Sequence, residues 1–396
     1  PYVVAQYIRV TGDADILEEQ VFFLEGDLLN EGQEEVYSVP RISNEKASLL
    51  EHCRRALQKG MTAGPHGLPL IGSCDWNDGM NRIGVGGRGE SVWLGWFLIH
   101  VLNDFADLLT FSSGLSDIGE GFRIQAKRLA KIIETTSWDG SWYRRAYFDD
   151  GTPIGSKENT EAFIDSLTQS WAVISEMADP ERAATALKSA EEFLVKYKEK
   201  LVLLLTPPFD KISHDPGYIK GYPPGVRENG GQYTHGSSWL AMAFARTGQG
   251  NKAYEIMKIL APTLHTSSVA ECELYKVEPY VIVADIYQLK DQIGRGGWSW
   301  YTGSAGWIYR IWVEEILGFK LRGDVLSIEC CIPEEWDQFK IDYKYKTAHY
   351  SITVTNPNHV SRGSCKVTLD GVLLEGQEFR LSDDSMKHVV DIVMKP

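Results

Sequence analysis

The hydrophobic periodicity of the sequence changes once, near Gly318, and this change limits the folds open to the chain. Before it, segments such as EKASLLEHCRRALQKG carry apolar residues at the i, i+3, i+4, i+7 spacing of an amphipathic helix. After it, segments such as FKIDYKYKTAHYSITVTN alternate between apolar and polar residues, which is the period of a half-buried β-strand. We therefore expect a helical domain over 1–317 and a smaller β-domain over 318–396.

The helical part also contains long connections rich in Gly, Pro, Trp and Asp. Loops of this length in a compact domain usually carry function. One segment, ESVWLGWFLIHVLNDFADLL, is apolar nearly all round, which predicts a helix buried inside a larger fold. Long helices whose loops converge on one end predict a helical toroid with a site at its mouth. The expected helices are 2–11, 44–59, 90–111, 117–136, 164–177, 181–198, 236–248, 251–261, 276–289 and 303–317; the long connections are 61–88, 137–162, 205–235 and 290–302.

The composition narrows the classes of partner. The net charge is −14, from 40 basic and 54 acidic residues, so nucleic acid and anionic membrane surfaces are excluded as direct partners, although a local site could still hold a small anion. The 12 Trp, 18 Tyr and 37 Gly suit a carbohydrate site, where aromatic faces stack on sugar rings, but Trp is more often a core residue.

The cysteine pattern and the first residues of the chain indicate the cellular compartment. The 6 Cys are scattered, with no CxxC pair and no zinc-like spacing, which is typical of a reducing compartment. The longest strongly apolar run, Val92–Ile99, is far below the ~20 residues of a membrane span, and no signal-peptide pattern is visible. We expect a cytoplasmic protein or a cytoplasmic domain of an inner-membrane protein. Because PYVVAQYIRVTGD already reads as a helix, we also expect the chain to be part of a longer one.

The densest polar cluster is GSCDWNDGMNRIG at 72–84. Asp75 and Asp78 stand three residues apart, with Trp76 beside the first of them. A carboxyl group next to an indole in a partly dry pocket has a raised pKa and can act as a general acid. The alternative is an Asx-turn or a helix cap, in which the carboxylates bond only backbone amides. The residue pattern alone leaves both open.

Two further clusters place polar groups beside a predicted helix start. RENGGQYTHGSSW at 227–239 has the pair Gly230 and Gly231, which allows a tight turn, followed by His235. A helix N-terminus with such neighbours can bind an anion. GGWSWYTGSAGW at 296–307 could present hydroxyl and amide donors to an oxyanion. In both clusters the alternative is a capped helix packed under aromatic side chains.

Taken in series, DWND, ENGGQYTHG and WYTGSAGW resemble the inverting glycoside phosphorylases of glycoside hydrolase family 94. The stretch VPRISNEKASLLEHCRRAL followed by HGLPLIGSCDWNDGMNRIG is most similar to the C-terminal phosphorylase-like region of the cyclic β-1,2-glucan synthases. The resemblance covers essentially the whole chain. It implies an (α/α)₆ barrel followed by a small β-sandwich-like domain, acting on a β-linked glucan, with β-1,2 linkage implied by the branch.

The resemblance also implies residue roles. Asp78, the second Asp of DWND, matches the general acid that protonates the glycosidic oxygen. The phosphate site matches His235, Thr302 and Gly303. Neither a metal nor an organic cofactor is implied, because inorganic phosphate is a co-substrate. The implied substrate contacts are Asp75, Trp76 in the subsite of the transferred sugar, and Tyr222, Arg227 and Glu228 on the acceptor side.

This chemistry needs one carboxylate rather than two. An inverting hydrolase requires an acid and a base about 6.5–9.5 Å apart, the base activating a water molecule. Phosphate is already a nucleophile, so a phosphorylase replaces the base with an anion site. The expected product is α-glucose 1-phosphate, with the configuration at the anomeric carbon inverted.

The sequence departs from the family pattern at its start. The family's Arg and Asp that hold the transferred sugar lie well upstream of DWND, and no matching motif occurs among the 74 residues before Asp75. We expect the N-terminal helices of the barrel to be missing and to come from a longer chain or another chain. The chain alone is then incompletely active or inactive. The relatives suggest a homodimer.

Two other functions stay open. The first is an inverting hydrolase on the same barrel, with Glu228 or Glu278 as the base; sugar release without phosphate would distinguish it. The second is a non-catalytic module that binds glucan or controls its length; it would keep its affinity after Asp78→Asn and would show no phosphorolysis.

Overall fold

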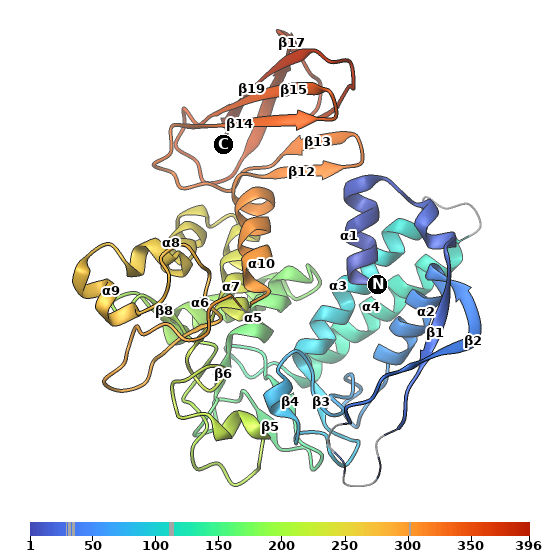
Figure 1. Cartoon of the computed structure of the whole chain (residues 1–396), viewed down its shortest axis with the longest axis vertical. Coiled ribbons are helices and arrows are strands. Elements are labelled where there is room, and N and C mark those ends of the chain that lie inside the picture. The colour runs from blue at the N-terminus through green and yellow to red at the C-terminus, as the bar shows by residue number, and fades with distance from the viewer. Residues whose placement is uncertain (29, 31–32, 34–35, 111–114, 301) are drawn as a thin grey trace.

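A computed structural model describes residues 1–28, 30, 33, 36–110, 115–300 and 302–396. Within these ranges, a helical region is followed by a region of β-sheets (Figure 1). The last helix, α10 (Ser304–Arg310), continues as a π-helical segment over Ile311–Ile316, and the first strand of the sheets begins at Phe319. Gly318, with φ of 73°, makes the turn between them.

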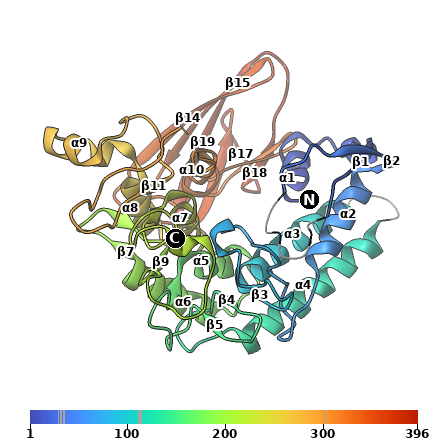
Figure 2. The ribbon, with the colours of Figure 1, turned by 60° about the horizontal axis from the view of Figure 1, so that its bottom comes forward.

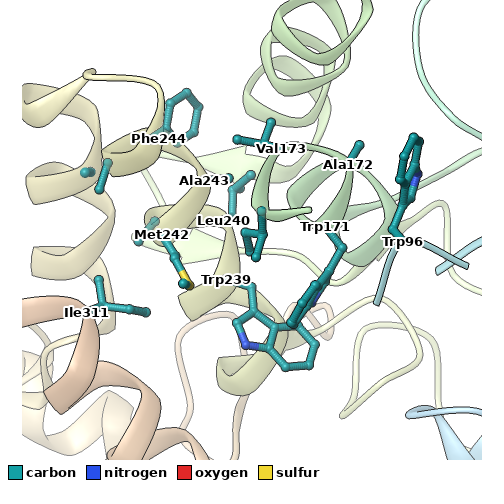
Figure 3. Close-up of a cluster of buried hydrophobic side chains, with 14 of the residues drawn as sticks. Trp96, Trp171, Ala172, Val173, Trp239, Leu240, Met242, Ala243, Phe244 and Ile311 are labelled. Atoms are coloured by element: carbon teal, nitrogen blue, oxygen red, sulfur yellow. The ribbon is translucent and has the colours of Figure 1, made fainter. Parts of the chain in front are cut away.

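Three helices form the inner layer of the helical region. They are α3 (Val92–Thr110), α5 (Ser166–Ile174) and α7 (Thr234–Arg246), and α5 packs against both of the others. Every residue of α5 and nearly every residue of α7 is buried. Trp171 of α5 and Trp239 of α7 meet edge to face, with ring centroids 5.1 Å apart (Figure 3). Of these helices α3 is apolar nearly all round, whereas the buried polar side chains of α5 and α7, such as Gln169, Ser170 and Ser237, bond backbone carbonyl groups.

Each inner helix is followed in the chain by an outer helix that packs against it: α4 (Ser116–Thr136), α6 (Pro180–Leu194) and α8 (Gly250–Leu260). The outer helices are amphipathic and bury one face only, which fits the predicted i, i+3, i+4 pattern. The other helical segments are α1 (Tyr2–Thr11), which packs against α3, then α2 (Leu49–Gly60), α9 (Val269–Tyr275), and the short 3₁₀ turns η1 (Asp15–Glu18), η2 (Asp78–Met80), η3 (Tyr218–Gly221) and η4 (Pro262–His265).

The inner helix α3 is the one described helix that is long and apolar enough to cross a membrane, over Val92–Leu109. Two thirds of this window, 67%, is buried inside the protein. A core helix passes the same test of length and composition, so this is weak support for a membrane span.

Two of the predicted helices are wrong in part or entirely. Over 44–59, the first residues form strand β2 (Arg41–Ser48), and the helix begins only after Ser48, whose side chain accepts the amide of Glu51 as an N-cap. The predicted helix 276–289 is absent. Helix α9 precedes it and ends where Lys276 takes a left-handed conformation, with φ of 58°. Apolar spacing alone did not distinguish that loop from a helix.

The sheets after residue 318 follow the predicted alternation. In β15, Tyr350, Ile352 and Val354 point into the core while their neighbours face outward. This strand pairs antiparallel with β14 and parallel with β19. The strands are β12 (Phe319–Arg322), β13 (Val325–Ile328) and β18 (Glu378–Arg380) in one sheet, and β14 (Gln338–Tyr345), β15 (Ala348–Thr355), β19 (Lys387–Lys395), β16 (Ser364–Leu369) and β17 (Val372–Leu373) in the other.

A two-residue strand directly precedes each of the inner helices α3, α5 and α7. The N-termini of these helices lie together at one end of the helical region, and Figure 2 turns this end toward the viewer. We refer to residues 61–91, 137–165, 205–233 and 276–303, which join the helices at this end, as the loop layer. Its strands are β3 (Glu90–Ser91), β4 (Ala146–Tyr147), β5 (Pro153–Ile154), β6 (Ile164–Asp165), β9 (Leu205–Thr206), β10 (Gln232–Tyr233) and β11 (Asp285–Ile286); β7 (Val195–Lys196) and β8 (Leu201–Val202) pair after α6, and β1 (Gln20–Glu25) pairs with β2.

Candidate active site

The DWND segment forms a tight loop that ends in the 3₁₀ turn η2. Asn77 caps this turn, its side-chain oxygen accepting the amide of Gly79 at 3.2 Å. Gly79 must lack a side chain, because a Cβ there would lie 2.9 Å from Cβ of Ile219 in η3. The fully buried Met80 anchors the end of the turn. Asp78 is left as the first residue of the turn, exposed to solvent.

The two carboxylates of the loop have different environments. Asp75 has no exposed side-chain surface, and both of its oxygens are bound by Arg145, at 2.6 and 2.7 Å. Burial alone would raise the pKa of Asp75, yet the charge and hydrogen bonds of Arg145 hold that pKa below its usual value. The substrate contact of Asp75 stays a prediction; in the structure its oxygens are bound by the protein, and it fixes the loop.

Asp78 has a neighbour that the sequence did not reveal. The phenol of Tyr218, in η3, lies near the Asp78 carboxylate, and burial together with this neighbouring carboxylate raises the pKa of the phenol. The ring of Tyr218 also meets Tyr222 edge to face, at 6.1 Å between centroids. No motif marked Tyr218, because its contact depends on the packing of η2 against η3, which are far apart in the sequence.

Trp76 belongs to an aromatic wall next to Asp78. Its ring meets Tyr233 at 5.6 Å, His235 at 5.4 Å and Trp239 at 5.5 Å between centroids. Trp76 is half-buried, so part of the indole is available to a ligand. The wall joins the DWND loop to the first turn of α7 and thus brings two of the predicted clusters together.

His235 lies in the first turn of α7 as a neutral imidazole. Burial lowers its pKa to about 4. Its Nε2 atom is buried and has no hydrogen-bond partner in the described structure. Buried polar atoms are normally paired, so an unpaired ring nitrogen at a helix N-terminus indicates a ligand position.

The third cluster lies against this histidine. A Cβ on Gly303 would be 3.9 Å from Cε1 of His235. The hydroxyl of Thr302 accepts the amide of Ser304 at 3.0 Å and also bonds the Ser304 hydroxyl. The N-cap of α10 is Gly303, without a side-chain cap bond, so the Thr302 hydroxyl bonds the first helical residue from the position before the cap. Tyr301 lies outside the described residues.

The predicted acceptor residues form a second group in the loop layer. Arg227 takes a left-handed backbone conformation, with φ of 52°, and its guanidinium lies between the rings of Tyr222, at 4.9 Å, and Trp298, at 4.3 Å. Glu228 is buried, its Oε2 has no hydrogen-bond partner, and burial raises its pKa. Asp78 also acts on Glu228 electrostatically, so the two carboxyl groups face one region.

Asp285 supports this group and was hidden by the wrong helix prediction. Strand β11 pairs Asp285 with Tyr233 of β10, which places its carboxylate under residues 297–298. Its Oδ1 accepts the amide of Trp298 at 3.2 Å, and a Cβ on Gly297 would lie only 2.2 Å from that oxygen. The second glycine of GGW is therefore required for the carboxylate to fit.

Glu278, the other candidate base, lies apart from this arrangement. It is half-buried, and its carboxylate accepts the indole N–H of Trp300 at 3.0 Å. Hydrogen bonds from backbone and side chains lower its pKa. Within the described ranges, no group of three or more His, Cys, Asp or Glu side chains is placed to hold a metal ion.

A loop carboxylate beside an aromatic wall and an unpaired imidazole defines a carbohydrate-active class of site. Residues 2–318 match the family model described as the glycosyl hydrolase 94 superfamily, catalytic domain, and the chain belongs to that family.

Curated relatives are similar over nearly the whole chain. Identity is 43% to the cyclic beta-(1,2)-glucan synthase NdvB of Rhizobium meliloti, over 94% of this chain but 13% of that protein. It is 31% to solabiose phosphorylase of Paenibacillus borealis, over 99% of this chain and 48% of that one. It is 28% to N,N'-diacetylchitobiose phosphorylase of Vibrio proteolyticus, over 94% and 44%. The chain thus spans less than half the length of each of these relatives.

Among solved structures, a GH63 mannosylglycerate hydrolase from Thermus thermophilus is similar with a TM-score of 0.36 and 14% identity, over 56% of this chain and 43% of that one. The overlap is too small to assign roles to residues.

Proposed function

We propose that the chain is a phosphorylase catalytic region that cleaves a β-linked glucan, of β-1,2 linkage, with inorganic phosphate to give α-glucose 1-phosphate. The family membership supports phosphorylase chemistry, and the similarity to a cyclic β-1,2-glucan synthase supports the linkage. The observation that carries the proposal is the division of labour in DWND: Asp75 is locked in an ion pair, so Asp78 is the carboxylate free to meet a substrate.

In the proposed reaction, Asp78 protonates the glycosidic oxygen while phosphate attacks the anomeric carbon from the opposite face. The bond between the anomeric carbon and that oxygen breaks as the new carbon–oxygen bond to phosphate forms, which inverts the configuration. Trp76 lines the subsite of the transferred glucosyl unit. The unpaired Nε2 of His235, with Thr302 and Gly303, is the proposed phosphate site.

On the acceptor side, Arg227, Tyr222 and Glu228 would contact the departing sugar. The stacked rings hold the guanidinium in one orientation, so little side-chain entropy remains to be lost when it binds a hydroxyl group. The buried Oε2 of Glu228 lies 3.4 Å from Nε of Arg227 without a hydrogen bond, and a sugar hydroxyl can supply one.

A hydrolase is the second candidate, because Glu228 and Asp78 interact electrostatically. Against this role, Oε2 of Glu228 lies 3.4 Å from Nε of Arg227, so the carboxylate is paired with a protein cation. Phosphate dependence separates the two functions.

We further propose that residues 1–317 belong to an (α/α)₆ barrel whose other helices come from a longer chain or from another chain. We also propose that the protein forms a homodimer, and that it is cytoplasmic or a cytoplasmic domain of a membrane-bound synthase. The coverage of the relatives supports the first point. The inner and outer helix pairs α3–α4, α5–α6 and α7–α8 match such a barrel in pattern.

The test is incubation with β-1,2-glucan with and without phosphate, for the full-length protein that contains the chain and for the 396 residues alone. The proposal expects glucose 1-phosphate only with phosphate, and only from the longer protein. Sugar release without phosphate would favour the hydrolase. Robust turnover by the 396 residues alone would contradict the incomplete barrel.

A further inference from the structure

A buried ionic network beneath the DWND loop has no role in the chemistry described so far. Its centre is Arg145, which has almost no exposed surface and binds Asp75 with both ends of its guanidinium. Asp165, equally buried, faces the remaining nitrogen: Nε of Arg145 lies 3.6 Å from Oδ2 of Asp165. Neither of these two atoms has a hydrogen-bond partner.

The network ties the loop to the inner helices. Asp165 caps α5, its Oδ1 accepting the amides of Leu167 at 2.8 Å and Thr168 at 3.2 Å. Ser91, the residue directly before α3, accepts the amide of Leu94 at 2.9 Å and donates its hydroxyl to Asp75 at 2.6 Å. The two helix N-termini therefore share one carboxylate–guanidinium assembly.

Asp75 in turn fixes the backbone next to Asp78, the proposed general acid. Asp75 Oδ1 accepts the backbone amide of Asn77 at 3.0 Å, and the Asn77 side chain accepts the amide of Gly79. The backbone on either side of Asp78 is thus fixed by hydrogen bonds at Asn77 and Gly79, whereas its own side chain is exposed, with the phenol of Tyr218 nearby. The direction of the Asp78 carboxylate is set mainly by the loop beneath it.

We propose that Arg145, held by Asp165, is a positioning residue for the general acid Asp78. This rests on the proposed function of Asp78. A two-pronged guanidinium–carboxylate pair fixes the orientation of the carboxylate as well as its position, which a lysine ammonium does not. A small misplacement of a catalytic group costs about 10²-fold in rate, because the reacting atoms must be aligned.

The test compares two arginine-to-lysine substitutions. Arg145→Lys keeps the charge but removes the fork. The matched control is Arg246→Lys: Arg246 is also largely buried and pairs with Glu315 at 2.9 Å, but at the C-terminal end of α7. We expect Arg145→Lys to lower kcat by about 10²-fold with KM changed less than about threefold, and Arg246→Lys to leave kcat within about twofold. Thermal midpoints of both variants show that the kinetic difference is not a difference in stability.

Retention of kcat by Arg145→Lys within about threefold would overturn the inference, as would an equal kcat loss in Arg246→Lys. If Arg145→Lys does not fold, Asp165→Asn replaces it, because Asn is an equally good N-cap but carries no charge for Arg145.

Hydrogen exchange of the peptide 72–84 provides a readout that does not depend on activity. The inference expects exchange to be about tenfold faster in Arg145→Lys and unchanged in Arg246→Lys. An unchanged rate in Arg145→Lys would contradict the inference even if the protein proves to have another activity. By contrast, wild-type protein without phosphate-dependent cleavage would contradict the proposed function alone.

Discussion

The loop layer and the C-terminal sheets differ in whether their buried polar side chains have hydrogen-bond partners. In the described part of the chain, the buried side-chain nitrogens and oxygens without a hydrogen-bond partner are divided equally between the loop layer and the inner helices that it precedes, and none lies in 319–396. The unpaired atoms at the loop end include those of Asn77, Glu228, His235 and Asp285. Buried unpaired groups reduce stability, so a region that keeps them is arranged for binding, whereas the sheets are arranged for packing.

Among variants that separate the two regions, we expect the largest effect from Asp78→Asn in the loop layer. Removing the general acid should lower kcat for glucan phosphorolysis by about 10³-fold, because acid catalysis is worth about 10²–10⁴-fold. The exposed side chain makes few packing contacts, so the thermal midpoint should stay within about 2 °C of wild type. Steady-state kinetics and differential scanning calorimetry measure the two effects. Wild-type kcat in this variant would remove Asp78 from the mechanism.

The reciprocal variant is Ile352→Ala in the sheets. Ile352 is fully buried in β15, between β14 and β19, so truncation should lower the free energy of unfolding by about 2–5 kcal/mol through lost packing and a cavity. Urea denaturation measures this. Below the unfolding transition, kcat should equal that of wild type, and a kcat loss there would show that the two regions are not separable.

A smaller effect is expected for Arg227→Lys on the acceptor side. A lysine keeps the charge but loses the flat guanidinium that lies between Tyr222 and Trp298. We expect KM for the glucan to rise about tenfold with little change in KM for phosphate, since a lost charged hydrogen bond is worth about 1.5 kcal/mol. A change in KM for phosphate alone would move Arg227 to the phosphate side.

The smallest effect is the dependence of stability on pH, and its sign should differ between the regions. The pKa of His235 is lowered to about 4, so between pH 6.5 and 4 the unfolded chain binds a proton that the folded chain does not. Its contribution to stability is present above pH 6.5 and is lost as the pH falls toward 4. In the sheets, hydrogen bonding to Asp370 raises the pKa of His388, so its contribution is present below pH 6.5 and is lost as the pH rises through the folded-state pKa.

Urea unfolding from pH 4.5 to 8 tests these signs. In His235→Gln, the free energy of unfolding should fall less between pH 6.5 and pH 4.5 than it does in wild type. In His388→Gln, the small increase in the free energy of unfolding below pH 6.5 should be absent; it is small because solvent screens this exposed pair. A steeper acid-side loss in His235→Gln would show that the imidazole is not held neutral.

Local patterns predicted much of this molecule. The change from helix to strand at Gly318 and the inner helix α3 both follow periodicities that lie within a few residues. The role of Asp75 did not, because its partner Arg145 is 70 residues away in the chain. Asp285 was missed for a related reason: a two-residue strand pairing, which local spacing does not encode, replaces the expected helix.

The most direct test of the account is the identity of the product formed from β-1,2-glucan and phosphate in ¹⁸O-labelled water, measured by NMR and mass spectrometry on the full-length protein that contains this chain. The account predicts α-configured glucose 1-phosphate with no ¹⁸O, formed by wild type and nearly absent in Asp78→Asn. Sugar released equally fast without phosphate, and without glucose 1-phosphate, would mean that water is the nucleophile, and would contradict the single-carboxylate phosphate mechanism.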